Sequence, residues 1–127
     1  MKIGLEAHVQ LTTKSKIFCG CPTRQAQEPN THTCDTCLGF PGSKPRVNIA
    51  AIDAAVRIAL ALNCTTARET AFSRKTYFYP DLAKNFQITQ YEAPIGTHGN
   101  LVINSKKIKI KRVHIEEDPA RLIHVSS

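Results

Sequence analysis

Residues 18–38 read FCGCPTRQAQEPNTHTCDTCL. This stretch carries two close pairs of cysteines on either side of residues 22–33, namely Cys19, Cys21, Cys34 and Cys37. Four thiolates at the corners of a tetrahedron match the coordination that zinc prefers in structural sites. The segment between the pairs has almost no apolar side chains, so a bound metal would have to order it. The spacing therefore predicts a zinc-bound loop whose closed site holds structure and does no chemistry.

Two other interpretations of these cysteines stay open. They could form two disulfides, or they could be four reduced thiols that pack as small hydrophobic side chains. Disulfides require an oxidising compartment, whereas the chain starts directly with a strand-like pattern and no signal peptide. The sequence therefore favours zinc and a cytoplasmic location. Cys64 stands apart from the two pairs, and we expect it to fill a buried position.

Composition indicates one compact domain or part of a larger one, since the chain has 127 residues of which 42% are hydrophobic. Arg57 interrupts the longest apolar run well short of a membrane span, so we expect a soluble protein. The chain has 17 Lys and Arg against 10 Asp and Glu, which favours a polyanionic partner such as nucleic acid. A basic surface that maintains solubility explains this charge equally well. Residues 123–127 read as the start of another strand, so we expect a longer protein.

Residues 2–11 alternate between apolar and polar side chains, which predicts a half-buried strand. On its polar face, Glu6 and His8 project side by side with about 7 Å between their Cα atoms, because a strand rises by about 3.3 Å per residue. This spacing would allow a carboxylate and an imidazole to share one divalent cation. A solvated face without a ligand is the other interpretation.

One long helix is predicted after the cysteine segment. Asn48 is a suitable N-cap, apolar residues then continue to about Leu62, and Asn63 can end the helix. The apolar side chains nearly encircle this helix, so we expect it to be buried on most sides. Asp53 and Arg57 mark its narrow polar edge.

Residues 72–91 interleave cationic and aromatic side chains: Arg74, Lys75 and Lys84 with Tyr77, Tyr79, Phe86 and Tyr91. Cations beside rings can hold phosphate groups while bases stack on the rings. An ordinary hairpin with aromatic packing across its strands is equally compatible, with a turn at residues 80–81.

Two further strands are predicted at residues 101–103 and 107–115, joined at Asn104-Ser105. The apolar positions change phase between Ile110 and Val113, which predicts a β-bulge near Arg112.

Three consecutive carboxylates follow these strands: Glu116, Glu117 and Asp118. Their mutual repulsion requires a cation, either magnesium or nearby lysines. His114, Glu116 and Asp118 are expected to share a face. The complete pattern predicts an α+β fold with mostly antiparallel sheet, one buried helix and the zinc-bound loop over residues 18–38.

Several of these segments together resemble the B subunit of the tRNA-dependent amidotransferases, the GatB family. The resemblance covers essentially the whole chain in the family's order and is carried by residues 3–11 (IGLEAHVQL), 17–21 (IFCGC), 29–31 (PNT), 34–39 (CDTCLG), 74–81 (RKTYFYPD), 87–90 (QITQ) and 113–118 (VHIEED). It implies that residues 1–127 are part of the N-terminal cradle domain, which has the kinase and transamidase functions.

The activity that this resemblance implies uses ATP and magnesium. The enzyme would phosphorylate the side-chain carboxylate of glutamate or aspartate mischarged on tRNA(Gln) or tRNA(Asn). Ammonia from a glutaminase subunit would then displace the phosphate and form the amide. The implied partners are the amidase (A) subunit and the small (C) subunit, which complete the enzyme, and the mischarged tRNA, which is its substrate. Because the two subunits are required, this chain alone should be inactive.

The resemblance also implies roles for individual residues. Candidates for catalysis and magnesium binding are Glu6, His8, Glu116 and Glu117. Candidates for binding phosphate, tRNA or the terminal adenosine are Arg74, Lys75, Lys84, Tyr79 and Gln87. For this site to exist, the opening strand must lie beside the segment that ends near residue 118. The alternative is a zinc-stabilised RNA-binding module without catalysis, which leaves the acidic cluster unexplained.

Overall fold

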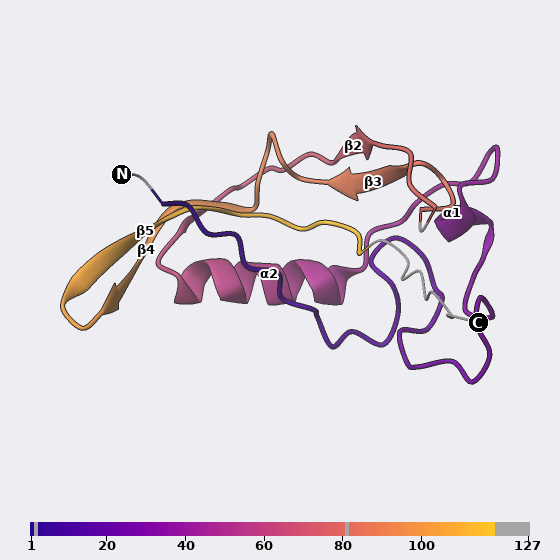
Figure 1. Ribbon diagram of the computed structural model, residues 1–127, viewed down its shortest axis with the longest axis horizontal. Helices are drawn as coiled ribbons and strands as arrows, with labels where there is room; N and C mark the ends of the chain where they lie inside the picture. The colour runs from indigo at the N-terminus through magenta and orange to yellow at the C-terminus, as the bar shows by residue number, and fades with distance from the viewer. Residues whose placement is uncertain (2, 81, 119–127) are drawn as a thin grey trace.

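The computed structural model describes residues 1, 3–80 and 82–118, and these form an α+β fold with antiparallel sheets (Figure 1). The elements, in chain order, are α1 (Asp35–Leu38), α2 (Ile49–Ala61), β1 (Thr65–Thr66), β2 (Ser73–Thr76), β3 (Phe86–Thr89), β4 (Gly96–Ile103) and β5 (Lys106–Val113). Strands β1, β4 and β5 make one sheet, and β2 pairs with β3 in a second sheet. The predicted α+β class with antiparallel sheets is therefore confirmed. The expected strand at residues 123–127 lies outside the described residues.

Helix α2 has the predicted start and end. The Asn48 side chain caps it by accepting a hydrogen bond of 3.0 Å from the backbone N–H of Ala50. Past its end, Asn63 takes a left-handed backbone conformation with φ 52°, which stops the helix. No helix in the described part of the chain is long and apolar enough to cross a membrane.

The prediction that this helix is buried on most sides is wrong. Only one face is fully buried, and it consists of small side chains: Ala51, Ala55 and Ala59. Ile49 and Leu60 are exposed. The small alanines allow the helix to approach β4 closely, where a Cβ added at Gly96 would lie 2.8 Å from that of Ala59. Ile52 and Val56 pack partly against the core, but the described chain covers only one side of the helix, so Ile49 and Leu60 on the other side stay exposed.

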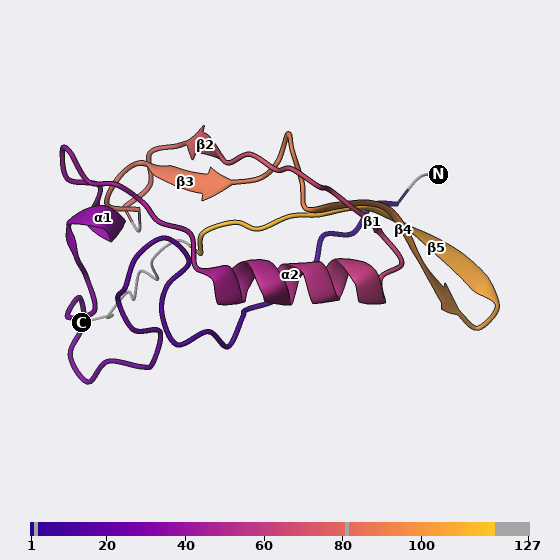
Figure 2. The same cartoon turned by 180° about the vertical axis from the view of Figure 1, so that it is seen from behind.

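The predicted C-terminal hairpin is present as β4 and β5, although β4 begins earlier than expected, at Gly96. Both residues of the connecting turn, Asn104 and Ser105, have positive φ (48° and 62°). This is the pattern of a type I′ turn, whose twist matches that of the two strands. The hairpin projects at one end of α2, and the cysteine segment lies at the other end (Figures 1 and 2).

The predicted bulge near Arg112 is wrong, because the strand register is unchanged on either side of it. Gly96 pairs with Val113 and Gly99 with Ile110, at the same offset. The distortion is instead at His98 in β4, with φ 55°. A Cβ added at Gly96 or Gly99 would meet the buried Cys64, so both positions face that residue despite their odd separation. We attribute the change of apolar phase in β5 to this backbone distortion at His98 in the neighbouring strand. Cys64 is buried, as expected.

The predicted strand at residues 2–11 is also wrong as far as the structure describes it. Residues 3–11 are in no strand, and Leu5 is 96% exposed. Alternating side chains form a strand only where a neighbouring strand accepts the backbone hydrogen bonds. No described strand of this chain pairs with the segment.

The core connects the cysteine segment to the sheets. Ala55, Ile95 and Ile115 form a buried cluster, and Ile17 and Phe72 pack against it. Phe18, which directly precedes Cys19, packs edge-on against Phe72 with 5.0 Å between ring centroids. The cysteine segment is therefore fixed to the rest of the domain at its first half.

Candidate metal centre and acidic site

The four clustered cysteines fit a tetrahedral metal. The sulfur atoms of Cys19, Cys21, Cys34 and Cys37 all lie within 4.8 Å of one another. Zinc–sulfur bonds of about 2.3 Å in a tetrahedron place sulfur atoms about 3.8 Å apart, so a small contraction would complete such a site. Among the described residues, no other group of three or more His, Cys, Asp and Glu side chains is so compact. The predicted cysteine cluster is therefore confirmed, and its thiolates suit zinc.

Local backbone structure presents these sulfurs to the site. Cys19 and Cys21 lie in a turn that is closed by a 2.9 Å hydrogen bond from the N–H of Lys16 to the carbonyl of Cys21. Cys34 and Cys37 lie at the N-cap and in the single turn of α1. One short turn therefore presents the sulfur atoms of each pair, as the spacing predicts.

The thiols differ in acidity. A hydrogen bond from the backbone N–H of Cys37 is the main reason that the pKa of Cys34 is lowered to about 6. Burial, followed by the neighbouring Cys34 and Cys19 side chains, raises the pKa of Cys21 to about 12. The site therefore holds both easily and reluctantly ionised thiols, and a bound cation would favour the thiolate form of all four.

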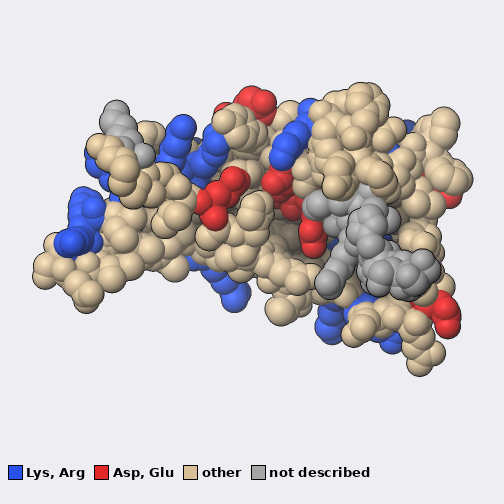
Figure 3. All heavy atoms as spheres, viewed as in Figure 1, with Lys and Arg blue, Asp and Glu red and all other residues tan. Residues whose placement is uncertain are grey.

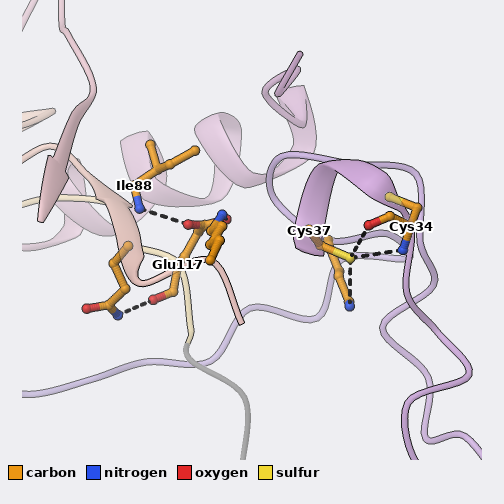
Figure 4. A network of polar contacts seen from close by, with 7 residues as sticks. Cys34, Cys37, Ile88 and Glu117 are labelled. Carbon is orange, nitrogen blue, oxygen red and sulfur yellow. Dashed lines mark hydrogen bonds and ion pairs between the residues drawn. The ribbon is translucent and has the colours of Figure 1, made fainter. Parts of the chain in front are cut away.

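The sulfur of Cys37 faces two nitrogen donors. The backbone N–H of Cys34 donates to it at 3.2 Å, and Nζ of Lys16 lies 3.7 Å away (Figure 4). Sequence reasoning missed the Lys16 contact. A lysine just before a Cys-x-Cys pair indicates such a contact only weakly, because the sulfur that it faces belongs to the second pair, which is distant in the sequence.

A second candidate site, the acidic site, contains Glu116 and Glu117 after β5. Both carboxylate oxygens of Glu117 have a partner (Figure 4). Oε1 lies 2.6 Å from Nζ of Lys84, and Oε2 accepts a 2.8 Å hydrogen bond from the backbone N–H of Ile88. The amide of Gln87 donates to the carbonyl of Glu117 at 2.5 Å. These contacts attach the segment after β5 to β3. Lys84 and Gln87 thus serve an internal contact in this structure.

Glu116 is held more loosely. Its carboxylate lies 3.4 Å from Nζ of Lys75, whose side chain is 59% exposed. The lysine partners of Glu116 and Glu117 both come from residues 73–89, the segment that contains β2 and β3. A lysine, one of the two counter-ions that the sequence left open, therefore lies beside each of these two carboxylates.

Glu6 and His8 lie within electrostatic reach of His114. Burial is the main reason that the pKa of His114 is lowered; Glu116 and Glu6 oppose this shift, while His8 adds to it. The opening segment therefore passes the end of β5, although not as a strand. With Glu116 and Glu117, these two residues do not form a compact ligand group in the described chain. Acidic side chains gather in the middle of this face, with basic ones above them (Figure 3).

Of the remaining candidates, Arg74 and Lys75 lie on β2, and Tyr79 lies in the connection between β2 and β3. Arg74 lies over the ring of Phe86, with 4.6 Å from its guanidinium carbon to the ring centroid, and Tyr79 is exposed. Nζ of Lys84 also lies near this ring, 4.9 Å from the Phe86 centroid. Arg74, Lys75 and Tyr79 are therefore available at the surface.

Sequence reasoning missed the buried polar residues at the end of β3. Gln90 is fully buried, and its Oε1 accepts a 3.2 Å hydrogen bond from the N–H of Ile115. Its Nε2 and the hydroxyl of the buried Thr89 have no hydrogen-bond partner in the described structure. The run QITQ at residues 87–90 could have predicted them, because alternating side chains in a strand place polar residues of this run on both faces of the sheet.

Comparison with known proteins gives a consistent result over the whole chain. A family profile described as the GatB/GatE catalytic domain matches residues 1–127. The chain is 54% identical to the B subunit of the aspartyl/glutamyl-tRNA(Asn/Gln) amidotransferase of Methanospirillum hungatei, over 98% of this chain and 27% of that protein. Proteins of the same name from Haloquadratum walsbyi and a Thermoanaerobacter species are 56% and 53% identical, each over 96% of this chain and 26% of the relative. The chain thus spans about a quarter of the length of these relatives.

Proposed function

Because the chain belongs to the GatB/GatE catalytic domain family, we propose that it is part of the subunit that amidates glutamate or aspartate attached to tRNA(Gln) or tRNA(Asn). Residues 1–127 would be the first part of its cradle domain. The observation that carries this proposal is the family match across the whole chain, together with more than 50% identity to three amidotransferase B subunits.

The proposed reaction has two steps. An oxygen of the substrate's side-chain carboxylate attacks the γ-phosphorus of ATP, which forms an acyl phosphate and releases ADP. Ammonia then attacks the carbonyl carbon, the C–O bond to phosphate breaks, and phosphate leaves as the amide forms. The substrate supplies the nucleophile in the first step. The protein therefore has to position the reactants and balance their charge.

We propose Glu6, His8, Glu116 and Glu117 as the magnesium site. Magnesium bound with ATP would neutralise phosphate charge, and it commonly uses one or two protein carboxylates plus waters and phosphates. A compact group of three protein ligands is therefore not required. Glu117 is held by the buried Lys84 and by the N–H of Ile88, whereas Glu116 pairs with the exposed Lys75 and Glu6 is exposed, so Glu6 and Glu116 are the freer carboxylates to bind a cation.

The other candidates have complementary tasks in this proposal. Arg74 and Lys75 would bind phosphate oxygens or the tRNA acceptor end, and the exposed Tyr79 would stack on the terminal adenosine. Lys84 would neutralise Glu117 and approach phosphate when the site is loaded, and Gln87 would hold the same segment in place. The cysteine cluster would bind a structural zinc.

The proposed assembly includes an amidase (A) subunit, which releases ammonia from glutamine, together with a small (C) subunit. Its aminoacylated tRNA substrate and its thiolate zinc site are both suited to the reducing cytoplasm.

The test uses the full-length protein in its complete three-subunit assembly. Glu6→Gln and Glu116→Gln should each abolish ATP-dependent formation of Gln-tRNA or Asn-tRNA, because each removes a charge that would hold magnesium. Binding of the mischarged tRNA should persist in both variants, as measured by filter binding. Asp53→Asn, on the exposed edge of α2, is the matched control and should retain activity.

Full amidation by both glutamine variants would contradict the proposed site. Loss of tRNA binding with intact amidation chemistry would instead support the alternative function, a zinc-stabilised RNA-binding module.

A further inference from the structure

Lys16 connects the two halves of the cysteine cluster. Its backbone belongs to the turn that carries Cys19 and Cys21, where its N–H donates to the carbonyl of Cys21 at 2.9 Å. Its side chain extends to the other half of the cluster. There Nζ donates to the carbonyl of His32 at 2.7 Å. It also lies 3.7 Å from the sulfur of Cys37 (Figure 4). One residue therefore contacts the first pair through its backbone and the second pair through its ammonium group.

The ammonium group of Lys16 can offset part of the negative charge that the cluster would carry with a metal bound. Four thiolates around a divalent cation carry a net charge of about −2, and the four cysteines are half-buried, so water compensates that charge only in part. An ammonium group close to one sulfur offsets one of these charges. A charge-assisted hydrogen bond is about twice as strong as a neutral one. The contact would therefore stabilise the metal-bound cluster more than the metal-free one.

No carboxylate competes for this ammonium in the part of the chain that the structure describes, where the ion pairs are those of Lys75 and Lys84. Lys44 and Arg46 line the same depression as Cys19 and Cys34. Neither makes a hydrogen bond to a cysteine sulfur among the described contacts. Lys16 is therefore the cation whose described contacts include a cysteine sulfur, that of Cys37.

The second contact of Lys16 acts on the loop between the cysteine pairs. His32 is near the end of residues 22–33, which have few apolar side chains to hold their shape. A hydrogen bond from Lys16 to its carbonyl fixes this end of the loop beside the first cysteine pair. The same ammonium thus orders the loop and faces Cys37.

We propose that Lys16 is a positioning residue of the metal centre: its ammonium group neutralises the Cys37 thiolate and holds the end of the loop, so that the bound zinc is released more slowly. This inference rests on the zinc site of the proposed function and concerns a residue outside its four ligands.

The experiment measures zinc release from the assembled enzyme to a chromogenic chelator in excess. Lys16→Met removes the charge at similar length and should release zinc at least about tenfold faster, since loss of an outer-shell partner commonly lowers metal affinity by 10–100-fold. Lys16→Gln can still donate to the His32 carbonyl but has no charge, so it should also release zinc faster. Lys16→Arg should restore slow release. Lys14→Met, an exposed lysine two residues earlier, should match the wild type.

A spectroscopic measurement separates this role from general loosening of the fold. With Co²⁺ in place of zinc, the sulfur-to-metal charge-transfer band reports the energy of the sulfur lone pairs. Because a cationic donor lowers that energy, its removal in Lys16→Met or Lys16→Gln should shift the band to longer wavelength. The band of Lys16→Arg should stay near the wild-type position.

The outcomes distinguish this proposal from the zinc proposal itself. Wild-type protein that contains no zinc by elemental analysis would overturn both. Wild-type protein that contains zinc, with equal release rates and equal Co²⁺ bands in Lys16→Gln and wild type, would overturn only the role of Lys16. If Lys16→Met is misfolded by circular dichroism, the comparison of the Gln and Arg variants decides.

Discussion

At the scale of single residues, Glu116 and Glu117 show how adjacent carboxylates acquire different tasks. The two side chains are similarly shielded, at 17% and 13% exposure, but their lysine partners are not. Lys75 is 59% exposed and Lys84 is 6% exposed. Removing a charge therefore leaves a hydrated ammonium in one case and a buried, unpaired ammonium in the other.

We predict that Glu117→Gln lowers the free energy of unfolding by about 3 kcal/mol, because breaking a buried ion pair leaves an uncompensated charge. The amide oxygen can still accept from Ile88, so the loss would come mainly from Lys84. Urea unfolding, followed by circular dichroism, measures this change.

Glu116→Gln is the matched control and should cost less than about 1 kcal/mol, because its partner Lys75 is exposed and stays hydrated when the charge is removed. Equal losses in the two variants would contradict the assignment of Glu117 as the structural anchor. The same control matters for function, because Glu116→Gln can then be tested for activity in a folded protein.

At the scale of elements, the turn of the β4–β5 hairpin needs two residues with positive φ, and its sequence supplies only one that readily adopts this conformation. Asn104 tolerates positive φ, but Ser105 has φ 62° without the freedom of glycine. Asn-Gly is the preferred pair for this turn type. The hairpin forms because the rest of its two strands pair in register.

Ser105→Gly should therefore raise the free energy of unfolding by up to about 1 kcal/mol. This net gain is the strain of a left-handed serine that glycine relieves, minus the larger conformational entropy that glycine has in the unfolded chain. Thermal unfolding measured by calorimetry would show a higher Tm. Ser105→Ala keeps the Cβ and should not raise the Tm. A lower Tm for the glycine variant would show that Ser105 contributes a contact that outweighs its strain.

At the scale of the whole molecule, the cysteine segment contacts the acidic site. Gly39 ends α1 with φ 75°, and a Cβ there would collide with Lys84, the partner of Glu117. The C-terminal end of α1 therefore packs directly on the residue that neutralises the carboxylate. The position of Lys84 is thereby linked to the order of the cysteine segment.

Removing the metal should loosen this end of the molecule without unfolding the β4–β5 hairpin at the other end. We expect chelation, or Cys34→Ser, to increase proteolytic cleavage within residues 22–33 and to speed hydrogen exchange near Lys84. Limited proteolysis and mass spectrometry measure both changes.

Cys64→Ser is the control for this experiment, because it removes a thiol outside the cluster and should leave the zinc content unchanged. Uniform loosening of both ends after chelation would contradict a local role of the metal centre.

Much of the local structure was predictable from the sequence. The cysteine spacing predicted the cluster, Asn48 and Asn63 predicted the limits of α2, and the apolar pattern around residues 104–105 predicted the hairpin. Each of these features depends on neighbours within a few residues or on one chemical requirement shared by four side chains. The family resemblance depends on motifs in the same way.

Only the tertiary structure decided what lies beside what. Residues 3–11 have a strand pattern but no strand partner in the described chain, the phase change in β5 follows a distortion at His98, and Glu117 pairs with a lysine 33 positions earlier in the chain. Local sequence specifies backbone preference and the side chains that are offered. Pairing, burial and charge balance depend on distant segments, because hydrogen bonds and ion pairs require two partners that folding alone brings together.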